Sequence, residues 1–143
     1  MTLATQTKPV APSRPPATSD EYQSGTCNIG PAEIARRRRA GHIGLAVAIV
    51  LLAVLVAIGA PPLARLLVAL PAAGAASGYL QAYLRFCAGF GSRGVYNFGA
   101  LGATQQVEDA DARKRDRARA TQIGLASVAI GVLVGVIAVV LPL

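Results

Sequence analysis

Apolar residues along this chain are gathered into three long blocks, and the charged residues lie between the blocks. No charged side chain occurs from Ile43 to Ala60, from Leu66 to Leu84, or from Thr121 to Leu143. At about 1.5 Å of rise per residue, runs of roughly 18 residues or more match the roughly 30 Å hydrocarbon core of a bilayer. Because a backbone in lipid must satisfy its own hydrogen bonds, each block is expected to be a helix. The pattern predicts an all-α integral membrane protein with three transmembrane helices.

The first two blocks form a predicted helical hairpin over residues 43–86, which turns at Ala60-Pro61-Pro62. Pro71 lies inside the second block and predicts a kink there, because proline removes one helical hydrogen bond and clashes with the preceding turn. Residues 121–143 are the predicted third span. The alternative, two spans and a peripheral helix, needs a polar face that this block lacks.

The segments outside the spans differ in composition. Residues 1–26 are rich in proline, threonine and serine, so they are expected to form a disordered tail. Residues 27–42 are expected to form a basic helix at the membrane surface. This helix is expected to begin after Gly30-Pro31 and to bend into the first span near Gly41-His42. Residues 87–120 are expected to form a cytoplasmic loop followed by an exposed, charged helix.

Basic residues outnumber acidic ones by 14 to 7, a formal charge of +7, and they cluster before the first and third spans. By the positive-inside rule, the N-terminus and residues 85–120 are expected in the cytoplasm, and the Pro61-Pro62 turn and the C-terminus outside. This is the pattern of a bacterial inner (plasma) membrane protein whose basic clusters contact anionic lipid headgroups. Charge beside apolar spans argues against a nucleic-acid partner. The residues expected to fix topology and contact lipid are Arg36, Arg37, Arg38, Arg39, Arg113, Lys114, Arg115, Arg117 and Arg119.

Two pairs of glycines stand four residues apart within the predicted spans. Gly74 and Gly78 lie in the second block, and Gly131 and Gly135 lie in the third. Small residues at this spacing share one helix face and let two backbones approach closely. The sequence therefore predicts that spans two and three pack through these glycines, within the chain or in an assembly.

Candidate chemistry is confined to two cysteines, Cys27 and Cys87, both predicted on the cytoplasmic side. Nearby arginines favour the thiolate, so the cysteines are candidate reactive thiols; the alternative is a pair of reduced, inert thiols. The chain has no Cys-x-x-Cys motif and no Cys/His ladder, so no metal site and no cofactor are expected. No acidic residue lies within a predicted span, which argues against a proton or cation relay.

Several short motifs resemble a known family. Asn28-Ile29-Gly30, Glu33 with the arginine cluster, and Phe86-Cys87 followed by glycines and aromatics resemble the YgaP-like inner-membrane transmembrane domain family over about residues 27–99. The resemblance implies a self-associating membrane hairpin, which some members join to a rhodanese-type sulfurtransferase domain. The chain departs from that pattern: Ala88 stands where the family has proline, no rhodanese domain is present, and the third span falls outside it.

Three functional hypotheses follow. The favoured one is a non-enzymatic membrane protein that acts by helix association, as a homo-oligomer or as an accessory subunit of a membrane complex. The second is a cytoplasmic-face thiol carrier in sulfur or redox handling, which needs Cys27 and Cys87 close together and accessible. The third is a channel or transporter subunit, which needs a polar strip along the spans.

Overall fold

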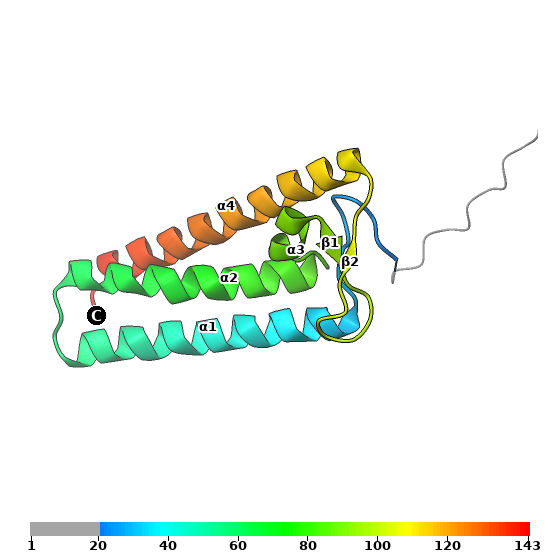
Figure 1. The fold of residues 1–143 in the computed structure, drawn as a ribbon. Helices are drawn as coiled ribbons and strands as arrows, with labels where there is room; N and C mark the ends of the chain where they lie inside the picture. Colours follow the sequence, from blue (N-terminus) through cyan, green and yellow to red (C-terminus); the bar gives the residue numbers. More distant parts are fainter. Residues whose placement is uncertain (1–20) are drawn as a thin grey trace, which may run out of the picture.

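The computed structural model describes residues 21–143, and these are mostly helical. Three long helices run side by side: α1 (Pro31–Ala57), α2 (Ala69–Tyr83) and α4 (Ala110–Val140) (Figure 1). A 3-10 helix, η1 (Pro62–Val68), leads directly into α2. The segments 31–57, 62–83 and 110–140 are each long and apolar enough to cross a membrane. The predicted all-α fold with three spans is confirmed.

The central element is α2, which packs against α1 on one side and α4 on the other, while α1 and α4 hardly touch (Figure 1). Small residues set the distance between α2 and α1 and the distance between α2 and α4. A methyl group added to Gly78 would lie 2.5 Å from the main-chain nitrogen of Gly41 in α1. One added to Gly131 of α4 would lie 2.6 Å from the carbonyl oxygen of Ala69. Glycine is required at both contacts because backbone meets backbone there.

The basic segment and the first span belong to one continuous helix. The expected bend near Gly41-His42 is absent, and α1 runs unbroken through these residues (Figure 1). The reason is local: Gly41 packs against the Tyr79 ring and against Gly78, so α2 supports α1 on both sides of the boundary between basic and apolar residues.

The proline in the second span also behaves differently from the prediction. Pro71 is the third residue of α2, directly after η1. Proline is tolerated in the first turn of an α-helix because its missing N–H has no intrahelical partner there. The chain therefore changes from 3-10 to α-helix beside Pro71, where the sequence predicted a kink within a longer helix.

Arg65 of η1 closes the end of the molecule opposite the basic clusters. It is 7% exposed and donates to the main-chain oxygens of Ala138, Leu141 and Leu143 at 3.4, 3.1 and 2.9 Å. These oxygens lie at and just beyond the C-terminal end of α4, a helix end that attracts cations. A charge in the predicted hairpin turn thus ties the second span to the third.

At the basic end, residues 21–30 and 84–109 form a small structure that we call the cap. It contains α3 (Ala88–Arg93) and a short antiparallel sheet of β1 (Val95–Tyr96) and β2 (Gln105–Gln106), in which Val95 lies opposite Gln106 (Figure 1). Phe90, at 6% exposure, is buried in it with Ile29 and Cys87, whereas Phe86, at 0% exposure, packs against Ala120 and Ile123 of α4. The sequence did not predict that this loop region folds into a core of its own.

The predicted disordered tail needs a correction over its last part. Residues 1–20 lie outside the described residues. Residues 21–26 form a turn in which the amides of Thr26 and Cys27 both donate to the Gln23 carbonyl. The turn rests on α4, because Gly25 donates to Asp116, and so this part belongs to the cap.

Candidate functional site

Four polar side chains are completely buried in and around the cap. Asn28, Glu33, Asn97 and Asp116 are each 0% exposed. A buried polar group destabilises a fold unless it finds hydrogen-bond partners. The partners of these four side chains therefore show what holds the cap to the spans.

Asn28 connects residues 27–30 of the cap to the segment that follows α2. Its side-chain nitrogen donates to the carbonyl of Cys87 at 3.1 Å, and the Cys87 amide donates back to its side-chain oxygen at 2.6 Å. The Asn28 amide donates to the carbonyl of Arg85 at 3.2 Å. One asparagine thus holds the backbone around Cys87 from both sides.

Asn97 continues this network toward α1. Its main chain accepts from Gly30 at 2.8 Å and donates to Asn28 at 3.0 Å. Its side-chain nitrogen donates to Ala100 at 2.8 Å and to Glu33 Oε1 at 3.4 Å. Asn97 therefore links the loop after β1 both to residues 28–30 and to the first turn of α1.

Glu33 is the buried anion of the cap. It lies in the first turn of α1, where a carboxylate is stabilised by the positive end of the helix dipole. Its Oε2 atom lies 3.8 Å from Arg36 and 3.9 Å from Arg37, and has no hydrogen-bond partner among the described residues. The two arginines compensate its charge at a distance without bonding to it directly.

Asp116 fastens the residue 21–26 turn to α4. It accepts from the Tyr22 hydroxyl at 2.8 Å and from the Gly25 amide at 2.6 Å. Gly25 has φ 70°, a left-handed conformation that glycine adopts without strain. Burial, and then the hydrogen bond to the Asp116 carboxylate and its negative charge, raise the pKa of Tyr22 well above its ordinary value.

Both cysteines lie inside the cap, as buried thiols. Cys87 is 1% exposed and Cys27 is 7% exposed. Arg37 Nη2 donates to Cys87 Sγ at 2.9 Å, and Cys27 Sγ lies 3.9 Å from the Ile29 carbonyl. The guanidinium groups of Arg37 and Arg93 also lie 5.9 and 5.6 Å from the centre of the Phe90 ring, in range of cation–π attraction. The structure thus brings both predicted thiols to one end of the molecule and buries them.

The four glycines predicted to mediate helix packing lie in three different surroundings. Gly131 and Gly135 of α4 pack against Ala69 in the second span, as predicted. Gly78 packs against Gly41 of α1 instead, and Gly74 has no other atom within 4 Å of where a methyl group would stand. Within the chain, the predicted packing of Gly74 and Gly78 on span three was wrong, because α2 has a neighbour on each side and the spacing alone cannot choose between them. Packing through these glycines in an assembly stays a prediction.

The predicted lipid-facing cations also divide into two groups. Arg37 and Arg113 are only half-buried: Arg37 contacts Cys87, and Arg113 donates to the carbonyls of Val107 and Glu108 at 2.8 Å each. These two arginines therefore stabilise the cap. Arg119 is also half-buried, beside Gln122 of its own helix. The other members are exposed: Arg36, Arg38, Arg39, Lys114, Arg115 and Arg117.

Sequence reasoning missed the buried polar cluster. Asp116 stands in a run of charged residues that predicted an exposed helix face, and Tyr22 stands in the predicted tail. Their contact joins residues 94 positions apart, and no local spacing reports it. Only the Asn28-Ile29-Gly30 and Glu33 motifs, singled out for their resemblance, pointed to part of this cluster.

The chain matches no protein-family model, no curated protein and no solved structure. The resemblance to YgaP-like domains therefore stays a prediction. Within residues 21–143, no group of three or more His, Cys, Asp or Glu side chains is placed to hold a metal ion. The function has to be argued from the surfaces and contacts of the chain itself.

Proposed function

We propose that this chain is a small, non-enzymatic integral membrane protein that acts by helix association, as a homo-oligomer or as an accessory subunit of a membrane complex. The observation that carries the proposal is the exposed face of α2 around Gly74. Gly74 has open space where a side chain would stand, and Leu70, one turn earlier, is 75% exposed. A gap next to a large apolar side chain lets a helix of another chain approach closely in lipid.

The cap supports a structural role for the polar residues. Asn28, Asn97 and Asp116 use their side chains to bind main-chain groups or Tyr22 of the same chain. Groups committed to internal contacts in this way stabilise a fold and are not open to a substrate. The cap is thus a rigid structure at one end of the molecule that fixes the spans relative to one another.

The test compares two glycines that both face open space, Gly74 in α2 and Gly124 in α4. In lipid nanodiscs, Gly74→Leu is expected to weaken association with a second copy, or with a co-purifying subunit, about tenfold, equivalent to about 1.4 kcal/mol. Gly124→Leu is the matched control and should leave association unchanged. The proposal fails if Gly74→Leu leaves both the oligomer size and any co-purifying subunit as in the wild type.

We further propose the bacterial inner membrane as the location, with the N-terminus in the cytoplasm and the C-terminus outside. Support comes from the placement of the basic residues at the end of the molecule that carries the cap, while Arg65 at the other end is buried against α4. Positive residues near span ends favour the cytoplasmic side.

A thiol carrier is the second candidate, and one contact favours it. Arg37 lies 2.9 Å from the Cys87 sulfur, and a neighbouring cation stabilises a thiolate. Against it stands the burial of both thiols, because a carrier must expose its sulfur to a reaction partner. The rate at which the thiols react in the folded protein separates the two candidates.

A further inference from the structure

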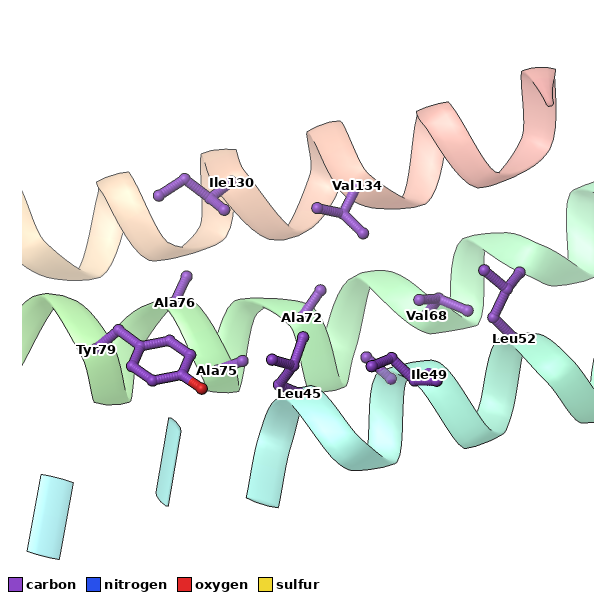
Figure 2. A pocket seen from close by; sticks show the side chains of 11 residues that line it. Leu45, Ile49, Leu52, Val68, Ala72, Ala75, Ala76, Tyr79, Ile130 and Val134 are labelled. Atoms are coloured by element: carbon purple, nitrogen blue, oxygen red, sulfur yellow. The ribbon is translucent and has the colours of Figure 1, made fainter. Parts of the chain in front are cut away.

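A groove of about 290 Å³ runs along one face of the second span, between α1 and α4 (Figure 2). Its floor consists of small side chains from α2, and its walls consist of larger apolar side chains from α1 and α4. Tyr79 stands at one end of the groove, with its hydroxyl as the polar atom among the labelled side chains of Figure 2. The floor includes Ala72, Ala75 and Ala76, and the walls include Leu45, Ile49 and Val134.

A second pocket shares Tyr79 with this groove, and its lining places Arg38 and His42 beside apolar surface. It has a volume of about 360 Å³ and is lined by Arg38, His42, Tyr79, Ala82 and Tyr83, so Tyr79 belongs to both linings. The Tyr79 hydroxyl lies 2.7 Å from Nδ1 of His42. Arg38 is exposed, and no residue from 21 to 143 pairs with it. Arg38, His42 and the Tyr79 hydroxyl thus lie at the Tyr79 end of the apolar groove, and we call this second pocket the mouth.

The length of the groove indicates what fills it. Its lining on the second span runs from Val68 to Tyr79, about 16 Å at roughly 1.5 Å per residue. That is about half of the roughly 30 Å hydrocarbon core, the depth of one leaflet. A lipid chain anchored at the mouth fits a groove of this length, and an anionic headgroup would complement Arg38 there. The spans of a second copy would not complement Arg38, because residues 43–60, 66–84 and 121–143 contain no acidic side chain.

We propose that this face binds one anionic phospholipid from the leaflet on the basic side. The phosphate would lie in the mouth against Arg38, His42 and the Tyr79 hydroxyl, and one acyl chain would lie in the groove. Tyr83, which is 85% exposed, stands where aromatic side chains contact headgroups. This site is separate from the proposed association face: Gly74 is two residues from both Ala72 and Ala76, which places it on roughly the opposite side of α2.

The experiment measures lipid retention by the full chain with native mass spectrometry, adding phosphatidylglycerol or phosphatidylcholine to detergent-purified protein. The wild type is expected to retain one phosphatidylglycerol in preference to phosphatidylcholine. Arg38→Gln should lower that preference about fivefold, the effect of removing one cation beside an anionic headgroup. Arg39→Gln makes the same charge change at an exposed position outside the pocket lining, and should have a smaller effect.

A separate variant tests whether an acyl chain lies in the groove. Ala76→Leu fills the floor of the groove and should reduce retention of both lipids, whereas Gly74→Leu on the opposite face should leave retention unchanged. A photoreactive side chain in place of Ile49, on the wall of the groove, should cross-link to lipid even if Ala76→Leu fails to fold.

Four results would overturn the proposal. Equal retention of the two lipids by the wild type would remove the headgroup selectivity. Equal losses of phosphatidylglycerol preference in Arg38→Gln and Arg39→Gln would show that the selectivity comes from general surface charge. Displacement of the lipid by inorganic phosphate would mean that the groove contributes nothing. Cross-linking from position 49 to a second protein chain would make the groove a protein interface. None of these results depends on whether Gly74→Leu changes association.

Discussion

At the scale of single residues, the buried charges Glu33, Arg65 and Asp116 each have polar or charged partners. Arg65 donates to main-chain oxygens at and just beyond the end of α4, and Glu33 lies in the first turn of α1, beside Asn97 and two arginines. Asp116, near the start of α4, receives an amide and a hydroxyl from the residue 21–26 turn. A buried charge without such partners would cost several kcal/mol, so these placements explain why the charges are tolerated.

Asp116 offers the sharpest single-residue prediction. Asp116→Ala removes the acceptor for both the Tyr22 hydroxyl and the Gly25 amide, which should destabilise the docked turn by roughly 1–3 kcal/mol. Hydrogen exchange measured by mass spectrometry should then show at least about tenfold faster exchange in residues 21–27. Asp111→Asn is the control, because Asp111 is exposed on the same helix. Unchanged protection in Asp116→Ala would mean that other contacts hold the turn.

The same contact predicts a dependence on pH. The pKa of Tyr22 is raised in the folded protein, so the folded state favours the neutral phenol. The stabilisation is fully present below the ordinary tyrosine pKa of about 10 and is lost as the pH rises above it. The turn should therefore undock in alkali before the spans unfold, and Tyr22→Phe should abolish this step in the exchange profile.

At the scale of elements, close helix packing depends on which neighbour each glycine meets. Gly78 lies against Gly41 of α1, so Gly78→Leu should force α1 and α2 apart and lower the free energy of unfolding by roughly 3 kcal/mol or more. Thermal unfolding in detergent measures this loss. Gly74→Leu, one turn earlier on the same helix, should leave the melting temperature unchanged, because open space surrounds Gly74. Equal melting temperatures for the two variants would contradict the observed α1–α2 packing.

The helices themselves were predictable from the sequence, and their partners were not. A bilayer leaves an apolar run no alternative to a helix, so the three blocks between charges sufficed to locate the spans. The spacing of Gly131 and Gly135 likewise identified a real packing face. The choice of Gly41 as the partner of Gly78 depends on how α2 is oriented between two neighbours, and no single-helix pattern contains that information.

At the scale of the whole molecule, the cap was the part that could not be predicted. Its stability comes from hydrogen bonds between residues far apart in the chain, such as Asn28 with Cys87 and Asn97 with Glu33. Local propensity suggested only glycine-rich loops in these regions. The cap joins the starts of α1 and α4 with the end of α2, so the three spans and the cap, apart from the separately docked residue 21–26 turn, should behave as one cooperative unit.

This cooperativity predicts how the two cysteines react. Cys27 and Cys87 are both buried in the cap, so a maleimide reagent should modify them only when the cap opens. In membrane vesicles at neutral pH, both thiols should react about 100-fold more slowly than in denaturing detergent, equivalent to an opening free energy of about 2.7 kcal/mol. Cys27→Ser and Cys87→Ser assign the two rates. Fast reaction of Cys87 in vesicles would instead show an accessible thiol beside Arg37, and would favour the thiol carrier over the association protein.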